Sequence, residues 1–296
     1  KVLTNKADGI GLYRTEFTYL IRRRFPTEDE LIEIYTSVMS RLGNSEVVIR
    51  TIDLGGDKIS HLVNQPAEKN PELGWRAVRL SLDRLDIFRT QLRAILRTAA
   101  TIGRQQAKIL FPMISNLGEL RRSQAFLHEV CDELKKEGVA IPTRILIGAM
   151  IEVPSAAILA DKIAREVDFL SIGSNDLVQY TLAVDRTNSK VAHLYQPANP
   201  AVLRLLHQVI QAAEKNGKPL SICGELAGDS RYTLMLLGLG LRELSMNSVF
   251  IPRVKQVVRL ISIEEARKAV LPLLELDTAE EIERELAQLN SRLGIN

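Results

Sequence analysis

Seven short apolar runs, separated by longer stretches of helical periodicity, constrain the fold of this chain more than any other feature. Each run has the length of a strand and is nearly continuous in hydrophobicity, as in parallel strands that are buried on both faces. The runs are GIGLYR from Gly9, VVIRTID from Val47, KILFPMI from Lys108, ILIGAMIE from Ile145, DFLSIG from Asp168, PLSICGE from Pro219 and RELSMN from Arg242. This alternation predicts an α/β fold, with a closed (β/α)8 barrel favoured over a doubly wound open sheet.

The segments between the runs carry the start and stop signals of helices. The stretch LGELRRSQAFLHEVCDELKKEG has Asn116 or Ser115 as its N-cap and Gly138 after its last turn. Residues 277–296 read as a terminal charged helix that belongs to the same domain, so we expect one domain over residues 1–296. The chain starts with Lys1 in place of Met and soon enters a strand-like run, which indicates part of a longer protein.

The composition of the 296 residues is 46% hydrophobic and 25% charged, which is ordinary for a globular protein. The formal charge is only +3, and basic and acidic residues are interspersed, so nucleic acid is not the expected partner. The two cysteines form no CxxC pair, and no apolar run reaches membrane-spanning length. We therefore expect a cytoplasmic protein with no membrane partner.

Arginines placed among small or apolar residues point to an anion site. They are Arg14 in LYRTEF, Arg50 in VIRTID, Arg76 in LGWRAV and Arg186 in AVDRTN. The guanidinium group matches phosphate or carboxylate oxygens with two parallel hydrogen bonds. The alternative for each is an ion pair with Glu16, Asp53, Asp57 or Asp185, or a charge on a helix surface. We expect Arg79, Arg93 and Arg97, which lie in helical stretches, to be solvated or structural.

Two carboxylates follow separate predicted strands and are candidates for a metal site. Glu152 comes directly after GAMI, and Asn175 and Asp176 follow FLSIGS. Active sites of α/β barrels lie at the carboxyl ends of the strands, and Mg²⁺ takes one or two protein carboxylates there. The alternatives are a helix N-cap for Asp176 and a structural ion pair for Glu152.

The two cysteines have different settings. Cys131 lies inside an amphipathic helical stretch and is expected to be a small buried hydrophobe. Cys223 ends an apolar run, beside Gly224 and Glu225. Because no histidine accompanies it in the sequence, we favour proton transfer over nucleophilic attack for Cys223.

Nearly the whole chain resembles one enzyme family in a series of ordered blocks. The blocks are GIGLYRTEF, IRTIDLGGDK, NPELGWRAVR, LFPMI, IEVPSAA, SIGSNDLVQYTLAVDR, HLYQP, CGELAGD and LSMN. They resemble the C-terminal domain of Enzyme I of the phosphoenolpyruvate:sugar phosphotransferase system, in its sugar or nitrogen-regulatory form. Pyruvate phosphate dikinases and phosphoenolpyruvate synthases share a weaker version of the blocks. The resemblance implies a (β/α)8 TIM barrel of the phosphoenolpyruvate/pyruvate-domain type.

The resemblance also implies roles for the residues of the blocks. Arg14, Arg50 and Arg186 would bind phosphoenolpyruvate oxygens, and Arg76 would line the site. Glu152 and Asp176 would bind Mg²⁺, Asn175 would contact the phosphate, and Cys223 would protonate the enolate of pyruvate. The implied activity is that of a phosphoenolpyruvate-protein phosphotransferase, with phosphoenolpyruvate and pyruvate as ligands and a homodimer as the assembly.

The chain departs from the family in two respects. The first barrel strand of the family precedes GIGLYRTEF by a helix, so we expect that strand to be missing here. The phosphate-accepting histidine of the family lies on a separate N-terminal domain in a TSH-like setting. None of the four histidines, which are His61, His128, His193 and His207, has that setting. We therefore expect the acceptor histidine on another domain, which would pass phosphate to a histidine-containing phosphocarrier protein.

Two alternatives stay open at this point. One is the equivalent domain of a dikinase or synthase, and the other is a phosphoenolpyruvate-sensing dimer module without catalysis.

Overall fold

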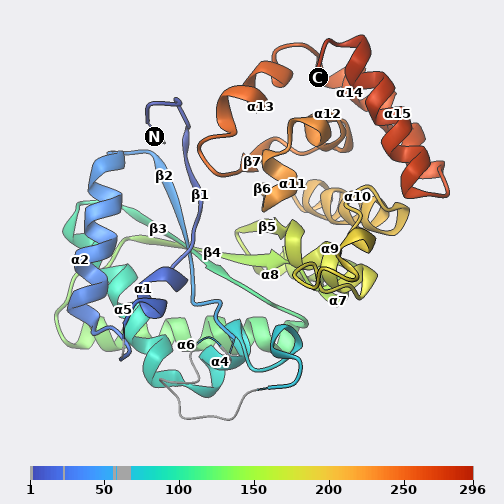
Figure 1. Cartoon of the computed structure of the whole chain (residues 1–296). Helices are drawn as coiled ribbons and strands as arrows, with labels where there is room; N and C mark the ends of the chain where they lie inside the picture. The colour runs from blue at the N-terminus through green and yellow to red at the C-terminus, as the bar shows by residue number, and fades with distance from the viewer. Residues whose placement is uncertain (1–2, 23, 56–57, 59–67, 296) are drawn as a thin grey trace. The chain divides into compact units, whose positions relative to one another are not determined.

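The computed structural model describes residues 3–22, 24–55, 58 and 68–295, and it divides into two compact units. The amino-terminal unit runs from Asp8 to Met150. The carboxyl-terminal unit contains the residues up to Ala7 and those from Ile151 onward. Each unit is described by itself (Figure 1).

The amino-terminal unit contains parallel strands in consecutive order. They are β1 (Gly9–Tyr13), β2 (Glu46–Arg50), β3 (Gln106–Phe111) and β4 (Arg144–Ile151), the last of which ends one residue into the other unit. The register of β2 on β3 pairs Arg50 with Leu110, and that of β3 on β4 pairs Phe111 with Ala149. The side chains of β2 from Val47 to Arg50 are all buried, as the continuous apolar run predicts.

The helices of this unit pack on the strands and on one another. They are α1 (Glu16–Leu20), α2 (Glu28–Met39), α4 (Ala77–Asp83), α5 (Leu85–Thr101) and α6 (Leu117–Lys136), with 3₁₀ turns η1 (Ser40–Leu42) and η2 (Pro71–Leu73). Helix α5 contacts both α2 and α6. Asn116 is the N-cap of α6 and accepts from the backbone N–H of Glu119, and Gly138 has φ of +73° beyond the last turn.

The carboxyl-terminal unit continues the alternation with β5 (Phe169–Gly173), β6 (Leu220–Cys223) and β7 (Glu243–Ser245), again parallel and consecutive. Its helices before β6 are α7 (Pro154–Ile158), α8 (Ala160–Glu166), α9 (Ser174–Leu182), η3 (Ala192–Leu194) and α10 (Pro200–Lys215). Those after β6 are α11 (Glu225–Gly228), α12 (Ser230–Leu239), α13 (Ile251–Val258), α14 (Ile263–Val270), η4 (Leu271–Glu275) and α15 (Ala279–Arg292). Helix α12 packs against α13, α14 and α15.

All seven predicted strands are present, and consecutive parallel strands with intervening helices are the topology of a (β/α)8 barrel. A doubly wound sheet would reverse its strand order at a switch point, which neither unit does. The predicted α/β barrel class is confirmed, with seven strands among the described residues. One domain over 1–296 stays a prediction.

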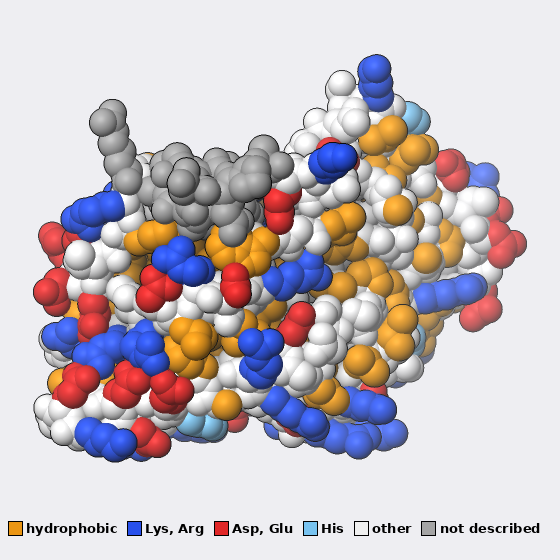
Figure 2. Space-filling view, turned by 90° about the horizontal axis from the view of Figure 1, so that it is seen from below, with side chains coloured by type: hydrophobic (Ala, Val, Ile, Leu, Met, Phe, Trp, Pro, Cys, Tyr) orange, Lys and Arg blue, Asp and Glu red, His pale blue; other side chains and the backbone are white. Residues whose placement is uncertain are grey.

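The described surface agrees with the interspersed charges of the sequence. Figure 2 shows acidic and basic side chains next to one another over much of the face drawn, with hydrophobic side chains gathered between them. Among the described helices, none combines the length and the apolar character needed to span a bilayer.

Candidate functional site

Arg50 is the last residue of β2 and is only 6% exposed. Its Nη2 lies 2.9 Å from Glu16 Oε1, and its Nη1 lies 2.8 Å from Asp53 Oδ2. Burying a guanidinium group is costly unless it is paired, so these two carboxylates explain how the strand end holds a cation. The ion-pair alternative is thus confirmed for Arg50. Binding of an anion by Arg50 stays a prediction.

Arg76 shares the same carboxylate from the start of α4. Its Nη2 and Nε lie 2.8 and 3.1 Å from Asp53 Oδ1, and Nη1 also pairs with Glu72. Burial raises the pKa of the Asp53 carboxyl, but the guanidinium groups of Arg50 and Arg76 outweigh burial and lower that pKa below its ordinary value. Asp53 therefore stays ionised and holds two of the predicted arginines side by side.

Arg14 follows β1 directly and is exposed. It has no hydrogen-bond or ion-pair partner among the described residues. The arginines expected to be structural do make such contacts: Arg93 pairs with Glu28 and Glu137, and Arg97 pairs with Glu28.

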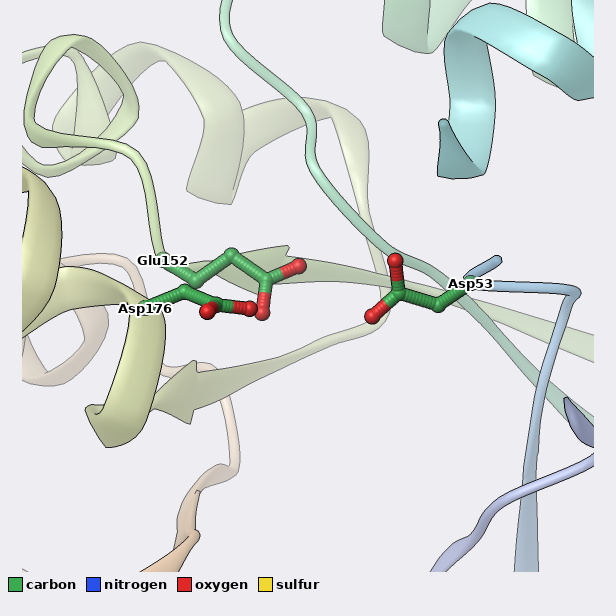
Figure 3. A group of neighbouring side chains, drawn as sticks. All are labelled: Asp53, Glu152 and Asp176. Atoms are coloured by element: carbon green, nitrogen blue, oxygen red, sulfur yellow. The ribbon is translucent and has the colours of Figure 1, made fainter. Parts of the chain in front are cut away.

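In the carboxyl-terminal unit, Glu152 and Asp176 lie at neighbouring strand ends. Glu152 follows β4 and is 1% exposed, while Asp176 lies in the first turn of α9, directly after β5. A carboxylate oxygen of each lies within 4.8 Å of the other, and Figure 3 shows the two groups side by side. The third label in Figure 3, Asp53, belongs to the other unit. The N-cap alternative for Asp176 is wrong, because Gly173 occupies the N-cap of α9.

Gly173 makes room for Glu152. A Cβ atom at Gly173 would lie 2.5 Å from Glu152 Oε2 and 2.7 Å from its Cβ. The upper limit of 4.8 Å between these oxygens can be compared with the distance of about 4 Å between two ligands on opposite sides of an octahedral Mg²⁺ ion. The donor set is oxygen only. These two residues fit a hard divalent cation.

The turn after β5 is tied to the turn after β6. Ser174 Oγ donates to the carbonyl of Cys223 at 2.6 Å, and the backbone N–H of Glu225 donates to Asn175 Oδ1 at 2.9 Å. Gly224, with φ of +102°, lies between these bonds, and a Cβ there would meet Ser174 Oγ at 2.3 Å. This turn conformation therefore requires glycine.

Cys223 is 4% exposed, and its thiol donates to the carbonyl oxygen of Ile172 at 3.3 Å. Cys131 is buried in α6, as expected.

Arg186 lies in the segment after α9, and its partner is none of the carboxylates named from the sequence, of which Asp57 lies outside the described residues. Its Nη1 pairs with Glu225 Oε1 at 2.8 Å, whereas the carboxylate of Asp185 accepts from the backbone N–H and the hydroxyl of Thr187. The Thr187 bonds lower the pKa of Asp185.

Sequence reasoning missed two residues of this arrangement. Ser174 is 1% exposed and links two strand ends, and Tyr195 donates to the carbonyl of Asn175 at 3.5 Å. A hydroxyl directly after the glycine that ends a strand was the available signal for Ser174. His128 lies in α6 and His207 in α10, while His61 lies outside the described residues.

Comparison with known proteins decides the family. Residues 1–263 match the model of the family described as PEP-utilising enzyme, PEP-binding domain. The chain belongs to this family. It is 49% identical over 280 residues to the phosphoenolpyruvate-protein phosphotransferase of Bacillus sp. (strain S), a match that covers 95% of this chain and 48% of that protein. With the protein of the same name from Bacillus subtilis (strain 168) it is 48% identical over 281 residues, covering 95% and 49%.

The predicted resemblance to phosphoenolpyruvate-protein phosphotransferases is thereby confirmed, and the chain spans about half the length of the curated relatives it matches. A solved structure of malate synthase from Haloferax volcanii, in complex with magnesium and glyoxylate, has a similar fold. That likeness has 13% identity and a TM-score of 0.50, and it covers 78% of this chain and 60% of the other. It concerns the fold alone.

Proposed function

We propose that this chain is the phosphoenolpyruvate-binding part of a phosphoenolpyruvate-protein phosphotransferase. It binds phosphoenolpyruvate with Mg²⁺ and supports transfer of the phosphoryl group to a histidine on another domain, with release of pyruvate. The observation that carries the proposal is identity of 49% across 95% of the chain to a protein of that name. The names of the relatives favour this activity over a dikinase or synthase. The non-catalytic alternative has no observation in its favour.

The residue roles follow the chemistry of the ligand. Arg14, Arg50, Arg76 and Arg186 bind phosphate and carboxylate oxygens, and Asn175 contacts the phosphate through its amide. Their positive charge stabilises the negative charge that spreads over the transferring phosphoryl group. Support comes from the buried positions of Arg50 at the end of β2 and Arg76 at the start of α4, since a guanidinium group held in place by the buried Asp53 carboxylate is preorganised for an anion.

Glu152 and Asp176 would hold the Mg²⁺ ion, which supplies charge neutralisation at the phosphate. When the bond between phosphorus and the enol oxygen breaks, its electron pair leaves with the enolate. Cys223 donates the thiol proton to the methylene carbon of that enolate, and pyruvate results. The position of the thiol supports this role, because Cys223 is buried at the end of β6, where Ser174 of the turn after β5 donates to its backbone carbonyl.

The acceptor histidine, the phosphocarrier protein beyond it, the homodimer and the cytoplasmic location belong to the same proposal. They rest on the family relationship and on the two free cysteines, which suit a reducing compartment.

Titration calorimetry of this chain with phosphoenolpyruvate and Mg²⁺ tests the proposal. We expect binding that Arg186→Ala weakens about tenfold or more, since a charge-assisted pair is lost. Arg165→Ala is the matched control: Arg165 pairs with Asp161 on α8, away from the strand ends, and its loss should leave the dissociation constant unchanged. Absence of binding, or equal weakening by both substitutions, contradicts the proposal.

A further inference from the structure

The ion pair between Arg186 and Glu225 has no role in the proposed chemistry so far. The carboxylate side chain is 74% exposed and the guanidinium side chain 35% exposed, with Nη1 and Oε1 2.8 Å apart. Arginine carries five N–H donors, so a pair through Nη1 leaves donors on Nη2 and Nε for an anionic ligand. Glu225 thus holds Nη1 of the guanidinium group and leaves its other N–H donors for a ligand.

Both members of the pair are anchored to α9 through their backbones. The backbone N–H of Arg186 donates to the side-chain oxygen of Gln179 at 3.2 Å, and the backbone N–H of Glu225 donates to Asn175 Oδ1 at 2.9 Å. Gln179 is buried, so its carbonyl oxygen is a fixed acceptor. The two bonds fix the backbones of Arg186 and Glu225 relative to α9. The ion pair then joins the two side chains to each other.

The other acidic or titratable groups near Arg186 are neutral or engaged elsewhere, so Glu225 is the residue that orients its side chain. Asp185 is adjacent in sequence, but its carboxylate is engaged by Thr187. The Tyr195 hydroxyl is neutral at ordinary pH, because burial above all, together with Glu225 and Asp176, raises its pKa to about 12 against the lowering effect of Arg186. The Asp176 carboxylate lies beside that of Glu152, within 4.8 Å, and belongs to the proposed metal site.

We propose that Glu225 is a positioning residue, which holds the Arg186 side chain in the orientation that binds the anionic substrate. The proposal rests on the proposed function, since it concerns how Arg186 meets phosphoenolpyruvate. An unrestrained arginine loses rotamer freedom when it captures a ligand, and a partner that restrains it beforehand reduces that loss. The opposite possibility is that Glu225 competes with the substrate for Arg186, which predicts tighter binding once Glu225 is removed.

Three variants of the chain, titrated with phosphoenolpyruvate and Mg²⁺, separate these roles. Glu225→Ala should raise the dissociation constant about fivefold, the scale of an exposed ion pair. Glu225→Gln keeps an oxygen acceptor for Nη1 and should stay within about twofold of the unsubstituted chain. Glu264→Ala removes an exposed carboxylate in a pair of the same length, with Lys268 on α14, and should change nothing. Because Glu225 lines an open cavity of about 410 Å³, its truncation leaves no hole in the core.

In a full-length protein that carries the acceptor histidine, Glu225→Ala should raise KM for phosphoenolpyruvate and leave kcat nearly unchanged. Tighter binding by Glu225→Ala, an unchanged dissociation constant, or an effect that Glu225→Gln reproduces in full would each overturn the positioning role. Failure of the unsubstituted chain to bind phosphoenolpyruvate would instead overturn the proposed function. The two failures are therefore distinguishable.

Discussion

The two cysteines are both buried, but only one lies where a proton is needed. Burial, the main cause, raises the pKa of Cys131 inside α6. Cys223 ends β6, within the network that links the turns after β5 and β6. Position, and not exposure, separates an inert thiol from a proposed acid, because the carboxyl ends of barrel strands are where substrates bind.

Replacing Cys223 by alanine should separate binding from proton transfer. Cys223→Ala keeps the small apolar volume, so the dissociation constant for phosphoenolpyruvate should stay within about twofold. In the full-length protein kcat should fall by about 10²–10⁴, the usual contribution of a general acid. Cys131→Ala is the control and should leave turnover unchanged. The measurement is the steady-state rate of pyruvate formation, and unchanged turnover in Cys223→Ala would remove this thiol from the mechanism.

At the scale of elements, the strand-end turns depend on glycines that have no room for a side chain. Gly224→Ala would place a Cβ 2.3 Å from Ser174 Oγ and 2.7 Å from Asn175 Oδ1, at a positive φ. We expect a loss of about 1–3 kcal/mol in the free energy of unfolding and weaker binding of phosphoenolpyruvate, since Asn175 must move. Gly217→Ala, with φ of +61° and open space around it, isolates the backbone cost and should leave binding intact. Denaturant unfolding and calorimetry measure both effects, and equal behaviour of the two variants would contradict the steric argument.

The strands could be predicted because parallel strands that are buried on both faces have continuous apolar sequences. Strands β4 and β5 are clear examples. Strand-end residues such as Glu152 and Cys223 followed from those runs. The partner of Arg186 could not be predicted, because Glu225 is 39 residues away and only the packing of α9 against α11 brings them together. Arg186 pairs with Glu225 and not with Asp185, because Thr187 donates two hydrogen bonds to the Asp185 carboxylate. Those two bonds could not be predicted from the sequence.

At the scale of the whole molecule, one buried carboxylate links distant parts of the amino-terminal unit. Asp53 pairs with Arg50 at the end of β2 and with Arg76 at the start of α4, while Arg50 also pairs with Glu16 of α1. Removing one partner of a buried ion pair costs about 3–5 kcal/mol when the remaining charge has no other partner, whereas here Arg50 would keep Glu16 and Arg76 would keep Glu72. The stability of the unit therefore depends on the ionisation of Asp53.

This dependence predicts how the protein responds to acid. The pKa of Asp53 is lower in the folded chain than its ordinary value near 4, so its stabilising contribution is present above about pH 4 and is lost as pH falls through the lowered pKa. Asp53→Asn should lower the free energy of unfolding at pH 7 by up to about 3 kcal/mol, since Glu16 and Glu72 still pair with the two arginines, and should flatten its fall between about pH 4 and pH 2. Glu30→Gln is the control. The Arg24 side chain lowers the pKa of Glu30 to about 2, but that pair is exposed, so its loss should change stability little. Urea unfolding at a series of pH values measures the free energy of unfolding of both variants. If this free energy falls as steeply at low pH in Asp53→Asn as in the unsubstituted chain, other carboxylates cause the acid destabilisation.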